Sequence, residues 1–200
     1  MAVTVVVRVM STPVSSSEQP SSAGATSRQG VLDSAAFDAL FRECATDVHG
    51  YLISLLGDRS TAEDLTALAF ERLYRSRSRL DRRRGTPRAW LFSIARNAAL
   101  DELRQRRRRS SYDLREDLAD DRVTGDALED AERRATVVDA LASLTLRERE
   151  LVLLKFHGQL SNGELARALG ISESNAGTRL HRALTRLREH CAETGREEVA

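Results

Sequence analysis

The chain has 200 residues, with 31 Lys and Arg against 30 Asp and Glu, so its formal net charge is only +1. This length allows one domain or two small ones, and no apolar run approaches the roughly 18 residues of a membrane-spanning helix. The two cysteines provide neither a disulfide framework nor a metal-binding spacing. Aromatic residues are scarce and strand patterns almost absent, whereas Ala, Leu and Arg are abundant, which predicts an all-α protein of a reducing cytoplasm.

Residues 1–30 are rich in Ser, Thr, Ala and Gly, and this composition predicts a disordered leader or an over-extended start of the chain. The apolar stretch at its beginning is short, is broken by Arg8 and lacks a convincing cleavage site, so we expect no signal peptide. A tail that binds a partner is an alternative that no residue pattern supports.

Two amphipathic helices are expected after the leader. The first runs from Ser34 to a stop at Gly57 and repeats apolar residues at steps of three and four, namely Phe37, Leu40, Phe41, Val48, Leu52 and Leu55. The second begins near Ser60, which forms a capping-box pattern with Glu63. Its apolar side consists of Leu65, Leu68, Ala69 and Leu73. Its acidic side either faces solvent or meets a basic partner protein, and consists of Glu63, Asp64 and Glu71.

A third helix follows a basic loop that runs from Leu80 to Gly85. Thr86 as N-cap and Pro87 at the first helical position form a strong start, and the helix should extend to about Arg109. We expect it to bury Trp90, Leu91, Ile94, Ala98 and Leu103, and to expose Arg88, Arg96, Asn97 and Asp101. The helix dipole accounts for one or two of the arginines at its end. The whole run, together with the loop, predicts a surface that follows phosphates with a steep salt dependence.

An acidic segment, residues 111–134, comes next and is predicted to be a linker. It is either a soluble spacer or a strap that lies against a basic surface when DNA is absent. Residues 137–157 then restore a core pattern, with a turn at Ser143–Thr145, a capping box of Thr145 with Glu148, and a helix that Gly158 ends. The apolar residues expected inside are Val137, Val138, Leu141, Leu144, Leu151, Val152, Leu154 and Phe156.

The stretch from Ser161 to Leu187 predicts two helices joined by a tight turn. Ser161 forms a capping box with Glu164, Gly170 supplies the left-handed residue that ends the first helix, and Ser172 caps the second. The second helix should bury Ala176, Leu180, Leu184 and Leu187. Its other faces carry side chains that donate to phosphates and base edges, namely Asn175, Thr178, Arg179, Arg182 and Arg186.

A helix buried on one side and polar on the other, placed after a short capped helix and a turn, is what docking into the major groove requires. An ordinary amphipathic helix with a solvated polar face is the alternative. Gly177 inside the helix weakens the prediction, because glycine costs about 1 kcal/mol relative to alanine there.

No enzymatic chemistry is expected. The chain has no Gly-rich phosphate loop and no isolated acid–base pair. His157, His181 and His190 lack the partners of a zinc site. We therefore expect no catalytic residue, no cofactor and no metal ion.

The order of these parts resembles the extracytoplasmic-function group of bacterial sigma factors, the specificity subunits of RNA polymerase, from Phe37 to Glu189. AEDLTALAFERLYR (residues 62–75) and RAWLFSIARNAALDELRQRRR (88–108) are similar to region two of that family, and residues 144–188 are similar to region four. The resemblance implies a region two helical bundle and a region four helix-turn-helix as two small domains. The implied boundaries are a leader at 1–30, region two at 31–109, an acidic linker at 110–134, region four at 135–190 and a tail at 191–200.

The resemblance also implies partners and sites. Core polymerase would bind Glu63, Asp64, Ala67, Leu68 and Glu71. The −10 promoter element would meet Arg82, Arg83, Arg84, Thr86, Arg96, Asn97 and Arg104, and the loop from Arg82 to Thr86 would capture an unstacked base. The −35 element would be read in the major groove by Ser174, Asn175, Thr178, Arg179, Arg182 and Arg186. An anti-sigma factor is a further implied partner, whereas a membrane and a small-molecule substrate are not.

Two positions depart from the family pattern. Leu68 stands where an acidic residue is common, and Ala176, Gly177 and Thr178 replace a Val-Lys-Ser-like triplet in the reading helix. The alternative function is a helix-turn-helix DNA-binding transcriptional regulator that does not associate with core polymerase, since residues 160–172 also resemble response-regulator output domains. That alternative leaves residues 34–109 as an unexplained sensor or dimerisation domain.

Overall fold

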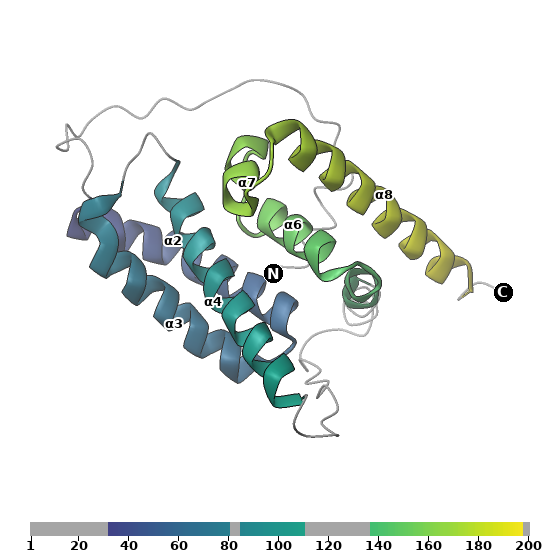
Figure 1. The fold of residues 1–200 in the computed structure, drawn as a ribbon, viewed down its shortest axis with the longest axis horizontal. Coiled ribbons are helices and arrows are strands. Elements are labelled where there is room, and N and C mark those ends of the chain that lie inside the picture. Colours follow the sequence, from purple (N-terminus) through teal and green to yellow (C-terminus); the bar gives the residue numbers. More distant parts are fainter. Residues whose placement is uncertain (1–31, 81–84, 111–136, 198–200) are drawn as a thin grey trace.

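The computed structural model describes residues 32–80, 85–110 and 137–197, and all regular structure in these ranges is helical. The first long helices are α2 (Ser34–Leu56), α3 (Arg59–Ser76) and α4 (Pro87–Ser110), and a short 3-10 turn, η1 (Arg77–Arg79), follows α3. These helices pack against one another as one bundle, the N-terminal bundle (Figure 1). The expected helices around residues 34–57 and 87–109 are thereby confirmed.

A second set of helices, the C-terminal group, starts with a helical segment at residues 137–143 and continues with α6 (Leu146–Phe156), α7 (Asn162–Leu169) and α8 (Glu173–Glu197). α8 packs on α6 and α7 and forms the outer side of this group in Figure 1. α2 contacts α6 and α4 contacts α7, so the two sets of helices lie against each other. No helix in the described part of the chain is both long and apolar enough to cross a membrane.

The expected capping boxes of the C-terminal group are confirmed. The hydroxyl of Thr145 accepts the backbone N–H of Glu148 at the start of α6, and the Glu148 carboxylate accepts the N–H of Thr145 in return. Ser161 and Glu164 make the same exchange at the start of α7. Gly170 ends α7 at φ 67°, in the left-handed region that favours glycine. These ends are fixed by contacts within four residues, which is why the sequence alone locates them.

The start of α3 differs from the prediction. The helix begins at Arg59, and its N-cap is Asp58 rather than a residue near Ser60. The Asp58 carboxylate accepts the backbone N–H of Thr61 at 3.2 Å and the hydroxyl of the same residue at 2.6 Å. Glu63, expected to reach back to Ser60, binds Arg59 at 3.0 Å instead. Aspartate caps a helix as well as serine does, so the sequence contains two competing starts and the earlier one is used.

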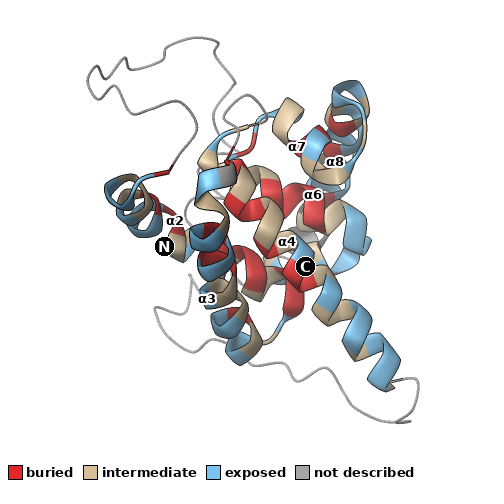
Figure 2. Ribbon diagram, turned by 60° about the vertical axis from the view of Figure 1, so that its left-hand side comes forward, coloured by how far each residue is buried: buried red, intermediate tan, exposed pale blue. Residues whose placement is uncertain are grey.

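One continuous core connects the two sets of helices, and its buried residues gather where α4 and α6 meet the rest of the protein (Figure 2). The largest fully buried side chains come from α2, α3, α4, α6, the residue before Ser161, and α7; they include Val48, Tyr51, Leu52, Leu73, Leu91, Phe92, Leu151, Leu154, Leu160 and Leu165. Because α2 contacts α3, α4 and α6, it lies at the centre of this core.

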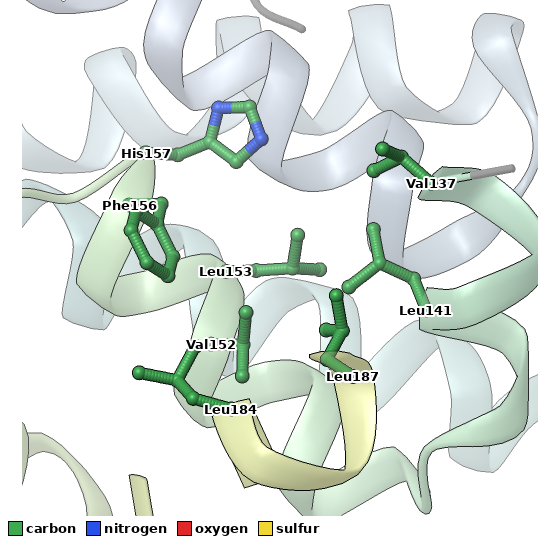
Figure 3. Close-up of a pocket in the computed structure, with 8 residues that line it drawn as sticks. All are labelled: Val137, Leu141, Val152, Leu153, Phe156, His157, Leu184 and Leu187. Atoms are coloured by element: carbon green, nitrogen blue, oxygen red, sulfur yellow. The ribbon is translucent and has the colours of Figure 1, made fainter. Parts of the chain in front are cut away.

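Two apolar residues that were expected inside lie largely outside the core. Phe41 is 47% exposed, because it sits on the outer side of α2 with its ring edge-on to Phe70, 4.8 Å between centroids. Val138 is 63% exposed, because Val137 and Leu141 take the inward positions of their helical segment and line a small apolar pocket with α6 and α8 (Figure 3). In both cases the apolar stripe of the sequence is wider than the face that the helix buries.

Truncation of a core side chain should destabilise the whole protein. Leu154 is fully buried on α6, and we expect Leu154→Ala to lower the free energy of unfolding by about 2–5 kcal/mol, because a cavity is left behind. Urea denaturation followed by circular dichroism measures this loss. The matched control is Leu146→Ala on the same helix, where the side chain is 44% exposed and the loss should not exceed about 1 kcal/mol. Equal losses would contradict the assigned core.

The glycine inside α8 should tolerate a side chain. A Cβ at Gly177 would meet only the Asn162 amide nitrogen, at an ordinary contact distance of 3.6 Å. We therefore expect Gly177→Ala to raise the free energy of unfolding by about 0.4–1 kcal/mol, since alanine restricts the unfolded chain and favours the helix. Gly170→Ala is the control with the opposite sign, because its φ of 67° disfavours alanine. Thermal denaturation distinguishes the two, and a destabilised Gly177→Ala variant would show that this position is packed.

Candidate nucleic-acid interface

The start of α8 is held by local contacts in a helix-turn-helix. The backbone N–H of Ile171 donates to the carbonyl of Ala166 at 3.0 Å, which closes the turn around the left-handed Gly170. Ser172 then caps α8, since its hydroxyl accepts the backbone N–H of Asn175 at 3.2 Å. α8 therefore leaves the turn in a direction that these hydrogen bonds determine.

α8 presents a polar face on the side away from the core. Ser174, Thr178, Arg179 and Arg182 are exposed and Asn175 is half-buried, whereas the expected apolar stripe faces inward. The Thr178 hydroxyl donates to the carbonyl of Ser174 at 3.0 Å. Arg179 and Arg182 have no carboxylate partner among the residues that the structure describes. Their guanidinium groups are therefore available to phosphates or base edges.

Arg186, further along α8, has a different environment. Its guanidinium group pairs with Glu148 of α6. The pKa of Glu148 is below its ordinary value, mainly because the carboxylate accepts the hydroxyl and backbone N–H of Thr145, and also because Arg186 lies beside it. The Arg186 side chain is nevertheless 60% exposed, so this ion pair contributes little to stability and leaves the guanidinium group accessible.

The exposed face of α3 carries the residues expected to bind polymerase. Asp64 and Ala67 are exposed, and Leu68, at the edge of this face, is half-buried. The two glutamates of the set pair with arginines of the same helix, as Arg59–Glu63 at 3.0 Å and Glu71–Arg75 at 2.6 Å. Exposed ion pairs of this kind contribute little to stability, so the carboxylates remain accessible to another protein.

Two arginines of α4 were expected to be exposed, and that prediction is wrong. Arg88 and Arg96 both point into the interface between the N-terminal bundle and the C-terminal group. The guanidinium group of Arg88 pairs with Asp47 of α2 and donates to the carbonyls of His157 and Gly158, each at 2.7 Å. The physical reason is that this side of α4 meets protein rather than solvent.

Arg96 is bound by Glu150 of α6. Arg96 Nε lies 2.6 Å from Glu150 Oε1 as an ionic contact that is not aligned as a hydrogen bond, while Arg96 Nη2 donates to Oε2 at 3.4 Å. The side chains are only 18% and 5% exposed. Burial raises the pKa of Glu150, and the nearby Arg96 only partly opposes this effect. Glu150 is the site residue that sequence reasoning missed, since nothing distinguishes it from the other charged residues of α6.

Thr86 caps α4 as predicted and also contacts the C-terminal group. Its hydroxyl accepts the backbone N–H of Ala89 at 3.1 Å and lies 2.7 Å from Glu164 Oε1, to which it donates. The backbone N–H of Thr86 donates to the same carboxylate oxygen at 3.3 Å. Three of the residues expected at the −10 element, Arg82, Arg83 and Arg84, lie outside the described residues, as do the expected leader and acidic linker.

The far end of α4 is the exposed part of the expected −10 surface. Asn97 is exposed, and so is Arg104, which pairs with Asp101 at 2.7 Å. Arg106 instead binds Asp58 at 2.8 Å and Glu102 at 3.0 Å, so this arginine of the run has a structural partner. No group of His, Cys, Asp and Glu residues within the described ranges could hold a metal ion.

Both sets of helices match known sigma factor regions. Residues 40–109 match Sigma-70 region 2, and residues 134–187 match Sigma-70, region 4. The RNA polymerase sigma factor CarQ of Myxococcus xanthus is 37% identical over 163 residues, which cover 81% of this chain and 91% of CarQ. The ECF RNA polymerase sigma factor SigL of Mycobacterium tuberculosis is 30% identical over 164 residues, which cover 82% of this chain and 93% of SigL.

Two solved structures share the fold. The sigma factor RpoE in its complex with the anti-sigma factor NepR from Bartonella quintana has a TM-score of 0.62 and 24% identity, covering 77% of this chain and 95% of RpoE. CnrH in complex with the cytosolic domain of CnrY has a TM-score of 0.58 and 22% identity, covering 78% of this chain and 88% of CnrH. The two matched regions and the identities to CarQ and SigL show that the chain belongs to the extracytoplasmic-function family of RNA polymerase sigma factors.

Proposed function

We propose that this chain, a sigma factor, binds core RNA polymerase and directs it to promoters by reading a −10 and a −35 element with different helices. The observation that carries the proposal is the exposed polar face of α8, opposite a buried apolar face, in a helix-turn-helix. Residues 31–109 would act as region two, residues 135–190 as region four, and residues 110–134 as the tether. The polymerase supplies the chemistry, and the chain acts in the cytoplasm, where that enzyme works.

The −35 element is the target of α8. The helix would enter the major groove with its first turns, and bases and phosphates would meet Ser174, Asn175, Thr178, Arg179 and Arg182. Arg186 would join this surface by exchanging its ion pair with Glu148 for a phosphate, since its side chain is 60% exposed. Gly177 stands where the family commonly has a lysine, so the phosphate contact of that lysine would be missing. The preferred −35 sequence of this chain therefore cannot be taken from its relatives.

The polymerase would bind the exposed face of α3. Glu63, Asp64, Ala67 and Glu71 recur at helical spacing along that face, and Leu68 adds an apolar contact at its edge. The negative charge of the stripe suits a basic surface on the polymerase. α3 and α8 lie on opposite sides of the protein (Figure 1), so the two contacts do not compete.

The −10 element would meet α4 and the loop before it. Thr86, Asn97 and Arg104 are exposed in the structure, although the Thr86 hydroxyl donates to Glu164, whereas the Arg96 side chain is only 18% exposed and is bound by Glu150. The loop arginines, Arg82, Arg83 and Arg84, would complete this surface and hold an unstacked base. Two individually weak contacts with DNA, joined by a tether, strengthen each other through effective concentration.

A protein inhibitor is part of the proposal. The RpoE structure that shares this fold is a complex with an anti-sigma factor. We infer that this chain also has an anti-sigma partner, which would cover the polymerase-binding face or hold the helices together. Identification of that partner requires capture by the purified chain followed by inhibition of transcription in a purified assay.

The first test removes the proposed base-reading arginines. Arg179→Ala and Arg182→Ala should each weaken binding of the holoenzyme to its promoter by about 1–3 kcal/mol while binding to core polymerase is unchanged. Arg188→Ala is the matched control, because Arg188 is exposed on the same helix but lies on the opposite side from Arg179. Electrophoretic mobility shift with a promoter mapped by start-site sequencing measures the effect. Normal transcription by both variants would show that α8 does not read the −35 element.

The second test concerns the polymerase contact. Asp64→Lys reverses a charge on the exposed face of α3, and we expect about tenfold weaker binding to core polymerase, or about 1.4 kcal/mol. Asp38→Lys is the control, since Asp38 is exposed on α2. Fluorescence anisotropy of the labelled chain with core enzyme measures both. A regulator of the alternative kind would bind duplex DNA alone, show no affinity for core enzyme and confer no initiation in a purified transcription assay.

A further inference from the structure

An arginine lies over the ring of an exposed tyrosine at the point where α3 ends and η1 begins. The guanidinium carbon of Arg77 is 3.7 Å from the centroid of the Tyr74 ring, and Tyr74 is 42% exposed. Nη1 of Arg77 donates to the carbonyl of Tyr74 at 2.9 Å, and the backbone N–H of Arg77 donates to the same oxygen. A long side chain that could adopt many rotamers is therefore fixed in one orientation.

Aromatic side chains of α2 and α3 support this pair. Phe37 meets the Tyr74 ring edge-on, with 5.1 Å between centroids, and meets the ring of the buried Phe70 at 6.3 Å. The carbonyl of Arg77 accepts the backbone N–H of the buried Leu32 at 3.4 Å. The tyrosine ring thus lies between the core and the guanidinium group, so the pair forms a fixed planar surface.

The charge of Arg77 has no partner on its own helix. Arg59 and Arg75 pair with Glu63 and Glu71, whereas no carboxylate in the part of the chain that the structure describes pairs with Arg77. Arg77 is half-buried rather than covered, so a second flat group can approach it. Bases stack on guanidinium planes and on aromatic rings, and a cation attracts the phosphate that each nucleotide carries. A nucleotide of a single strand therefore fits this surface.

The position of the pair favours a nucleotide over a protein as its ligand. α3 ends and α4 begins at the same end of the N-terminal bundle (Figure 1), so the pair lies at the end where Thr86 starts α4. The sequence from residue 77 to residue 84 contains five arginines and one aspartate, and positive charge beside aromatic rings is typical of single-strand binding. The face proposed to bind polymerase lies earlier on α3, at Glu63, Asp64 and Glu71.

We propose that Tyr74 and Arg77 form a stacking platform for one unpaired nucleotide of the opened promoter strand, with the base on the guanidinium group and the tyrosine ring beneath it. The contact does not depend on the identity of the base, because every base has a flat face. It retains the opened strand beside the bases that other residues of the −10 surface recognise. This inference rests on the proposed function, because it adds a contact for the same opened −10 element.

The test uses the chain assembled with core polymerase and a fork-junction oligonucleotide that carries the mapped −10 element, with 2-aminopurine at each unpaired position in turn. Arg77→Lys keeps the charge and removes the plane, and Tyr74→Leu removes the ring. We expect each variant to bind the fork about tenfold more weakly and to lose the fluorescence quenching that the unchanged chain produces at one position. Tyr74→Phe keeps the ring and should behave as the unchanged chain does.

Arg72→Lys is the matched control. Arg72 is exposed on the same helix, and no ring within the described ranges lies beneath its guanidinium group. The control should change neither the affinity for the fork nor the quenching. Because Arg77→Lys preserves the number of positive charges, the slope of log affinity against log salt concentration should also stay the same. Every variant should keep its affinity for core polymerase.

The results separate this inference from the proposed function. If Arg77→Lys and Tyr74→Leu leave fork binding and quenching unchanged while the unchanged chain supports transcription, the platform is overturned and the sigma factor function stands. Weaker binding of either variant to core polymerase also overturns the platform, because the pair would then belong to a protein interface. If the unchanged chain supports no transcription with core polymerase, the proposed function fails and the platform fails with it.

Discussion

Among the described polar groups that hold the C-terminal group on the N-terminal bundle, the half-buried Arg88 guanidinium group has the most partners. The carbonyls of His157 and Gly158 lie at the end of α6, where a helix leaves acceptors without partners in its own backbone. Arg88 satisfies both, while Asp47 balances its charge and Cys44 Sγ lies 3.2 Å from its Nη1. Without this side chain the two carbonyls would lose their donor, which costs free energy most clearly at Gly158, a buried residue. The path of the chain from α6 into α7 is therefore tied to the beginning of α4.

Neighbouring residues of α4 therefore have different tasks: some pack against the C-terminal group, and others are proposed to bind DNA. One residue along an α-helix rotates the side chain by about 100° around the axis, which is why Arg96 is buried against Glu150 while Asn97 beside it is exposed. The face of α4 that carries Asn97 and Arg104 is therefore open to a partner, while the face that carries Arg96 lies against α6. Of the residues proposed for the −10 element on α4, only those on the open face can meet DNA in this arrangement of the helices.

The features that could be predicted from the sequence are those with local causes. The caps at Thr86, Thr145 and Ser161 depend on residues three positions away, and the structure confirms all three. The start of α3 was misplaced because Asp58 and Ser60 are both good caps and only the folded protein chooses between them. The faces of Arg88 and Arg96 could not be foreseen, because their partners lie on other helices and an arginine at helical spacing has the same pattern whether it meets phosphate or carboxylate.

The near-zero net charge conceals a local excess of positive charge on which the proposed −35 contact depends. On α3 the exposed carboxylates are matched by exposed arginines of the same helix, and Arg59 pairs with Glu63 and Arg75 with Glu71. On α8 the stretch from Ser174 to Arg188 carries four exposed arginines and contains no Asp or Glu. Opposite charges within a Debye length cancel, so α3 presents little field to DNA, whereas this stretch of α8 attracts phosphates. The orientation in which the chain approaches a promoter is then biased before any base is read, because the positive charge is concentrated on the helix that would do the reading.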